Sequence, residues 1–134
     1  MGVAMFLLVP LAGYAGLWLA GIVVFLVFFR LWHVPVDPRR PAEMIRRLPA
    51  LVVVAAVPLC AFVSFFVTAS AALPAQVTAG QAALSGVACL AWTVALDLLI
   101  TVAGEKIDIR AFPLNAMYLA AWAVIIPAVM LARL

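Results

Sequence analysis

Four long runs of apolar residues alternate with short segments that hold most of the charged side chains. The runs cover residues 3–29, 50–72, 79–103 and 113–133. An α-helix rises about 1.5 Å per residue, so a run of about 20 apolar residues crosses the ~30 Å hydrocarbon core of a bilayer. The pattern predicts an all-α membrane protein, a single domain over residues 1–134. Its four transmembrane helices would form an up-down bundle in which consecutive spans are neighbours.

The amino-acid composition is that of a membrane protein. Of the 134 residues, 70% are hydrophobic and 10% are charged, whereas a soluble domain has about half its residues apolar and about a quarter charged. The first run has no preceding basic segment and no small-residue cleavage site, so we expect a retained helix and not a signal peptide. The net charge is +3, but the basic residues cluster where apolar runs end, which argues against nucleic-acid binding.

The distribution of basic residues predicts how the chain lies in the membrane. The first and third loops hold most of them: Arg30, Arg39, Arg40, Arg46, Arg47, Lys106 and Arg110. The opposite side has only Arg133. The positive-inside rule then places both charged loops in the cytoplasm and both termini outside. We expect a multi-pass protein of the cell membrane, specifically a bacterial inner membrane.

The first loop, residues 34–49, is rich in proline and arginine. Pro41 suits the first position of a helix, so we expect a short interfacial helix before Pro49, with Met44, Ile45 and Leu48 facing lipid. The bilayer and its anionic lipid headgroups are the expected partners of the interfacial arginines: Arg30, Arg39, Arg40, Arg46 and Arg47. A specific acidic ligand is the alternative.

Asp97 is the only acid within any of the four apolar runs. Its place in the third run puts it roughly 9 Å from the bilayer centre. An ionised carboxylate at the centre of a bilayer is unfavourable by at least a few kcal/mol, so such acids usually face protein or water. The helix face around Asp97 carries hydroxyl groups at Thr93 and Thr101, which can hydrogen-bond a neighbouring helix.

Polar and aromatic side chains in the fourth run lie at a matching depth. Asn115, Tyr118 and Trp122 share one helix face, in the half of the span nearest the third loop, and Asp97 occupies the same half of its own span. We therefore expect a hydrogen-bonded cluster of Asp97 with Asn115 or Tyr118. The candidate residues for ligand binding or ion coupling are Asp97, Thr93, Thr101, Asn115, Tyr118 and Trp122.

Small residues recur along the first run. Ala12, Gly16 and Ala20 stand four residues apart, with Gly13 and Gly21 beside them. Such a series lets two helix backbones approach closely. We expect it to pack against another helix of the same chain, and homo-oligomerisation is the alternative.

The chain gives no signal for a metal or a cofactor. Cys60 and Cys89 lie within apolar runs and form neither a C-x-x-C motif nor a Cys/His ligand spacing. We expect both to be small buried side chains. A redox pair is the alternative, and it requires adjacent second and third spans with Cα atoms within ~7 Å. His33, the only histidine, is expected at the lipid interface, with a proton relay as the alternative.

Three functional hypotheses remain. The sequence does not contain serine, histidine and acidic residues spaced as nucleophilic catalysis requires. The first run also lacks the glutamate that is expected of a four-helix drug exporter. The sequence favours an accessory or structural subunit that packs against itself or a larger membrane-protein partner. The alternative is a small oligomeric transporter, flippase or channel in which Asp97 binds a cation or a proton. A third hypothesis is a lipid enzyme in which Asp97, Glu105 and first-loop arginines meet a phosphate headgroup.

Overall fold

The computed structural model describes residues 2–104, 109–110 and 112–133. Glu105, which the lipid-enzyme hypothesis needs, and Lys106, which the orientation argument uses, lie outside these residues.

Four long apolar helices form the protein, and each is long enough to cross a membrane. They cover Met5–Leu31, Ala50–Ala72, Ala79–Gly104 and Leu114–Leu131. The elements in chain order are η1 (Ala4–Leu8), α1 (Val9–Leu31), α2 (Pro41–Arg46), α3 (Ala50–Ala72), α4 (Ala79–Leu96), η2 (Asp97–Gly104), α5 (Leu114–Ala123) and α6 (Ile125–Leu131). The predicted all-α bundle of four membrane-length helices is confirmed.

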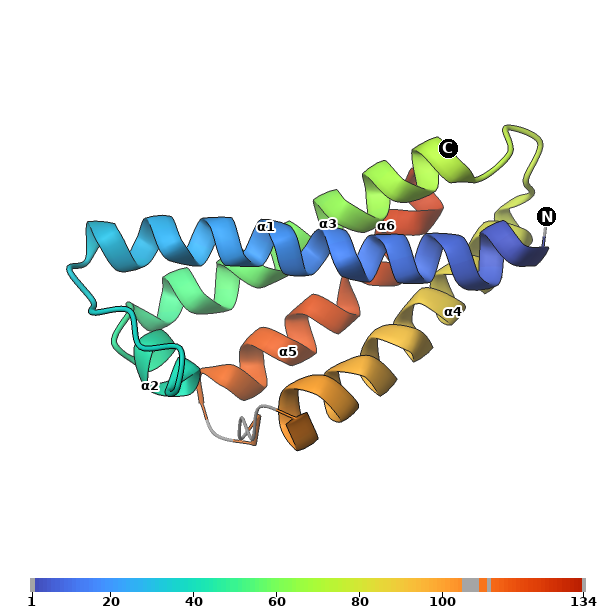
Figure 1. Ribbon diagram of the computed structural model, residues 1–134. Helices are drawn as coiled ribbons and strands as arrows, with labels where there is room; N and C mark the ends of the chain where they lie inside the picture. The colour runs from blue at the N-terminus through green and yellow to red at the C-terminus, as the bar shows by residue number, and fades with distance from the viewer. Residues whose placement is uncertain (1, 105–108, 111, 134) are drawn as a thin grey trace.

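The order of the helices around the bundle differs from their order in the chain. Consecutive spans run in opposite directions, and the two termini lie toward the same end (Figure 1). α1 packs against α3 and α4, while α5 and α6 pack against α3, and α6 also packs against α4. α3 and α4 follow each other in the chain, but they pack mainly against other helices. The prediction that all consecutive spans are neighbours is wrong for this pair, so the redox-pair hypothesis for Cys60 and Cys89 loses its geometric premise.

Two members of the series of small residues in α1, Gly13 and Gly16, pack against α3 within the chain. The hydroxyl of Ser64 in α3 donates a hydrogen bond to the Gly13 carbonyl oxygen at 2.7 Å. A Cβ atom on Gly13 would meet the Phe65 ring at 2.5 Å, and one on Gly16 would meet Ser64 Oγ at 2.5 Å. Glycine at both positions therefore lets α1 and α3 approach closely.

Side chains of α4 hold the beginning of the first span. Pro10 has no backbone N–H, so one carbonyl group about one turn earlier loses its usual donor. Ser85 Oγ donates to the Met5 carbonyl at 2.9 Å, and Trp92 Nε1 donates to the Phe6 carbonyl at 3.0 Å. These hydrogen bonds satisfy the carbonyls of η1 and fasten the first span to the third.

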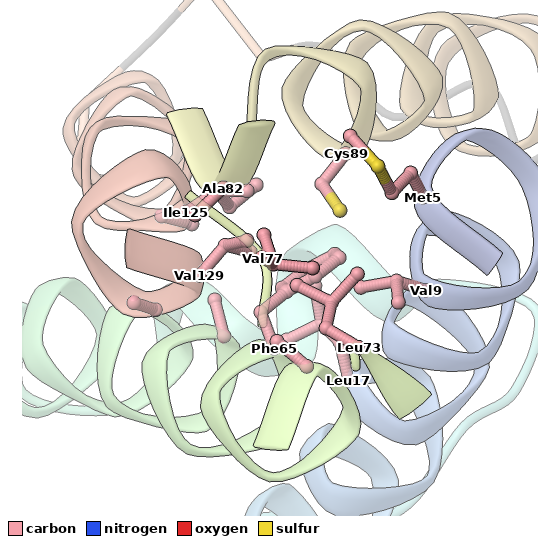
Figure 2. Packing of buried hydrophobic residues seen from close by; sticks show 14 residues of the cluster. Met5, Val9, Leu17, Phe65, Leu73, Val77, Ala82, Cys89, Ile125 and Val129 are labelled. Carbon is pink, nitrogen blue, oxygen red and sulfur yellow. The ribbon is translucent and has the colours of Figure 1, made fainter. Parts of the chain in front are cut away.

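Two clusters of buried apolar side chains form the core. Phe65 lies at the centre of the first, and Figure 2 shows Val9, Ile125 and Val129 gathered around it from α1 and α6. The second joins the C-terminal end of α1 to the first loop and α5. It contains Phe29, Val34, Met44, Leu48, Val53, Leu114 and Met117. The short helix predicted after Pro41 is present as α2, but Met44 and Leu48 face the bundle and not lipid, because they complete this cluster.

His33 ends the first span by its backbone conformation. Its φ of 53° lies in the left-handed region. The N–H of His33 donates to the Arg30 carbonyl at 3.3 Å, and the N–H of Val34 donates to the Phe29 carbonyl at 2.8 Å. These are the two hydrogen bonds of a Schellman motif, and the buried side chains of Val34 and Phe29 add its usual apolar contact.

Side chains satisfy backbone groups at the end of α3 and at the start of α4. Thr78 and Gln81 form a capping box at the start of α4, with hydrogen bonds of 3.0 and 3.2 Å. Arg133 Nη2 donates to the carbonyl of Ala69 at 3.0 Å and also to that of Ser70, in the last turn of α3. Arg133, the basic residue that stands apart from the charged loops in the sequence, thus satisfies carbonyl groups at the end of a helix.

Gly13→Ala tests the close approach of α1 and α3. We expect it to lower the free energy of unfolding by about 1–3 kcal/mol, because the new methyl group must displace the buried Phe65 ring. Gly21→Ala is the control, since a Cβ atom there meets nothing within 4 Å. Thermal unfolding in detergent micelles measures both variants, and equal melting temperatures would contradict the packing.

His33 substitutions test whether this residue acts through its backbone. His33→Val is expected to lower stability by roughly 1 kcal/mol or more, because a β-branched side chain is strained at positive φ. His33→Gly is expected to melt at or above the temperature of the unsubstituted protein. An equal loss in both variants would show that the imidazole ring matters instead.

Candidate functional site

Asp97 lies inside the bundle, where α4 passes into η2. Its side chain is 6% exposed. Asp97 Oδ1 accepts a hydrogen bond from the Tyr14 hydroxyl at 2.9 Å, and Asp97 Oδ2 accepts one from Trp122 Nε1 at 2.8 Å. Tyr14 belongs to the first span and Trp122 to the fourth, so the carboxylate connects three of the four spans.

The hydrogen bonds that Asp97 accepts come from Tyr14 and Trp122, whereas Asn115 or Tyr118 was expected. Trp122 was among the candidate site residues, and its ring lies 6.1 Å from that of Tyr118, centroid to centroid. Asn115 directs Oδ1 to its own helix, where it accepts from the N–H of Ala116 at 2.7 Å. Sequence reasoning missed Tyr14. The available signal was a phenol in the middle of an apolar span, because a buried tyrosine hydroxyl usually needs a partner.

Thr93 and Thr101 are both buried in the third span. Each is 1% exposed, and neither hydroxyl has a hydrogen-bond partner among the residues that the structure describes. A threonine in a helix commonly donates to the carbonyl four residues earlier, as Thr68 does to Ser64 at 2.7 Å. Thr101 also lies beside the Tyr14 hydroxyl. The two unpaired hydroxyls therefore stand on either side of Asp97 along the same span.

The backbone from Asp97 onward is a π-helix, η2, which extends to Gly104. Its i→i+5 hydrogen bonding widens the helix relative to α4, and π-helical turns occur frequently at functional sites. Asp97 and Thr101 both lie in this segment, and both are buried. The change of helix type thus coincides with the acid and with one of the unpaired hydroxyls.

A cavity of about 370 Å³ lies against Asp97 and Thr101. Its other walls come from α1, the loop before α2, α2, α3 and α5, and they are mainly apolar. The aromatic side chains in the wall are Trp18, Phe25, Phe29 and Tyr118. α1 and α5 are not closely packed against each other, and in Figure 1 α5 is seen between the diverging α1 and α4. The Tyr14–Asp97–Trp122 hydrogen bonds therefore link α1 to α5, whose backbones do not approach closely, through the third span.

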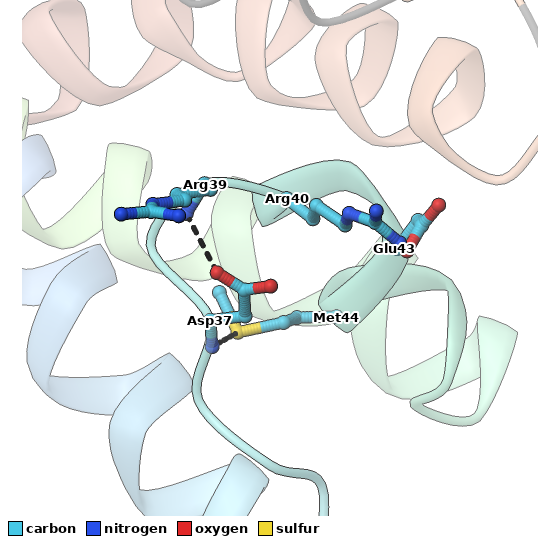
Figure 3. Close-up of polar contacts among 5 residues, drawn as sticks. All are labelled: Asp37, Arg39, Arg40, Glu43 and Met44. Carbon is cyan, nitrogen blue, oxygen red and sulfur yellow. Dashed lines mark hydrogen bonds and ion pairs between the residues drawn. The ribbon is translucent and has the colours of Figure 1, made fainter.

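The folded first loop closes one side of this cavity. Figure 3 shows the backbone N–H of Arg39 donating to Asp37 Oδ1 at 3.0 Å, and that of Asp37 reaching Met44 Sδ at 2.9 Å. Met44 in turn lines the cavity. The candidate headgroup residues Arg30, Arg39, Arg40, Arg46 and Arg47 are all exposed. Arg40 pairs with Glu43 at 3.5 Å, on the surface of this loop.

No family model, curated protein or solved structure matches this chain. The chemistry of the site must therefore be argued from its own residues. Within the described part of the chain, no three His, Cys, Asp or Glu side chains are grouped so that they could hold a metal ion. What the residues do provide is one carboxylate, one unpaired hydroxyl and an aromatic wall around a cavity.

Tyr14→Phe tests the bridge between the first and third spans. We expect it to lower the free energy of unfolding by about 1 kcal/mol, because Asp97 loses one donor while the aromatic ring still fills its place. A double-mutant cycle with Asp97→Asn measures the coupling, and thermal unfolding in bilayer nanodiscs gives the four stabilities. Strictly additive losses would show that the two side chains do not act together.

Proposed function

We propose that this chain is a small four-span membrane protein that binds a lipophilic or amphiphilic molecule in the cavity beside Asp97, as part of its transport. The observation that carries the proposal is the cavity itself, with an intramembrane acid in its wall. Asp97 would then be a binding residue, and the chain would belong to the class of small transporters or flippases.

The size and lining of the cavity support a bound molecule. Ligand pockets usually measure about 300–1,000 Å³ and are mainly apolar with a few polar groups. The cavity here measures about 370 Å³ and has Asp97 and Thr101 among its few polar walls.

The orientation predicted from the basic residues belongs to the same proposal. With both charged loops in the cytoplasm, the cavity would open beside the cytoplasmic leaflet, because the first loop forms part of its wall. The exposed arginines of this loop would then contact anionic headgroups. A molecule dissolved in that leaflet could reach the cavity without crossing the bilayer first.

An accessory or structural subunit remains the second candidate. It is favoured by the two hydrogen bonds that Asp97 already accepts, since these tie together three spans of the same chain. In that case Asp97 would stabilise the folded bundle, and the cavity would be filled by lipid tails that bind without specificity.

Gly21→Phe distinguishes the two candidates. Gly21 lines the cavity, and a Cβ atom there meets nothing within 4 Å, so a larger side chain can enter the cavity without displacing the backbone. In nanodiscs, a long-chain alcohol with a photoreactive diazirine in its tail should label cavity residues such as Phe25, Phe29 and Met117. We expect Gly21→Phe to reduce this labelling by about tenfold or more, because the bulky ring and the tail cannot share the space.

The matched control is Val23→Phe, which adds a ring to an exposed position of the same helix. It should leave the labelling of cavity residues unchanged. Uniform labelling along all exposed faces of the spans, equal in both variants, would reject a binding cavity and favour the accessory role.

A further inference from the structure

The polar wall of the cavity carries the Asp97 carboxyl group, and no basic side chain of the described cavity lining faces it. Asp97 accepts hydrogen bonds from Tyr14 and Trp122, which are both neutral donors. No lysine, arginine or histidine is among the described residues that line the cavity. A carboxylate offers about four acceptor positions, so two hydrogen bonds leave capacity for another donor.

We infer that the occupant of this cavity is a cationic amphiphile, an ammonium head on an apolar tail, whose head is bound by Asp97 and Thr101. The inference rests on the proposed function and adds the chemical class of the ligand. An ammonium group supplies a positive charge that the described cavity lining lacks, together with N–H donors for the Asp97 carboxylate. Charge-assisted hydrogen bonds to a carboxylate are the strong ones in proteins.

The buried hydroxyl of Thr101 is a second, independent observation that supports a ligand with hydrogen-bond donors. Its side chain is 1% exposed and lines the cavity, and its hydroxyl has no hydrogen-bond partner in the part of the chain that the structure describes. Leaving a buried hydroxyl unpaired is unfavourable. An ammonium N–H that reaches Thr101 Oγ1 and the Asp97 carboxylate together would satisfy both groups.

The remaining walls suit the rest of such a molecule. Four aromatic rings line the cavity, those of Trp18, Phe25, Phe29 and Tyr118. Aromatic faces attract cations, most strongly where water is excluded, and the apolar side chains around them accommodate a hydrocarbon tail. A carboxylate or phosphate head would instead find no cation among the described residues of the cavity wall.

The experiment compares three photoreactive probes that share one diazirine-bearing dodecyl tail and differ in the head: a primary ammonium, an alcohol and a carboxylate. Each probe is titrated against the full chain in nanodiscs of zwitterionic lipid, and mass spectrometry locates the labelled residues. We expect half-maximal labelling of the cavity by the ammonium probe at about tenfold lower concentration than by the alcohol. The carboxylate probe should label the cavity least.

Threonine variants test the role of the hydroxyl. Thr101→Val keeps the shape of the side chain, and we expect it to raise the half-maximal concentration of the ammonium probe by about fivefold. Thr93→Val is the matched control, because Thr93 is equally buried and unpaired but does not line the cavity. Thr101→Ser, which keeps the hydroxyl, should bind as the unsubstituted protein does.

Each outcome decides between the two proposals. Equal labelling of the cavity by alcohol and ammonium, or strongest labelling by the carboxylate, would overturn the cationic ligand while leaving a binding cavity in place. Equal effects of Thr101→Val and Thr93→Val would remove Thr101 from the site. If none of the three probes labels the cavity, the proposed function fails together with this inference. Should Thr101→Val fail to fold, the comparison of head groups in the unsubstituted protein still decides.

Discussion

The structure depends on one constraint: a polar group within a membrane-length bundle must find its partner inside the protein. Asp97 shows it most clearly, since its carboxylate takes one hydrogen bond from the first span and another from the fourth. In hydrocarbon no water is present to supply these donors. The acid therefore specifies which spans must meet around it, a requirement that apolar contacts alone do not impose.

The same constraint governs the backbone. Pro10 removes a donor near the beginning of the first span, and Ser85 and Trp92 of the third span supply replacements. Ser64 bonds the Gly13 carbonyl where α1 and α3 approach most closely. Arg133 satisfies carbonyls at the end of α3. The few polar side chains of this apolar chain are thus used mainly to join one span to another.

Thr101 and the cavity are the exception to this pattern. Thr93 and Thr101 are both buried without a hydrogen-bond partner among the described residues, but of the two only Thr101 lies beside about 370 Å³ of space. Here the backbones of α1 and α5 do not approach closely, and the two helices are joined through Asp97 and through side chains of the apolar clusters. The hydrogen bonds of Asp97 hold the spans in place, and the cavity lies beside them. A rigidly held polar group next to a cavity is the arrangement expected of a binding site.

The sequence by itself determined the number and the approximate extent of the spans, because apolar runs of that length have few alternatives to membrane-length helices. It also singled out Asp97, Thr101 and Trp122, since polar groups are rare in such runs. It could not identify Tyr14, because that partner depends on which faces meet. Nor could it show that α3 and α4 are separated within the bundle or that Met44 faces inward. Those features were decided by tertiary packing, in which close approach at Gly13 and the filling of two apolar clusters set the helix order.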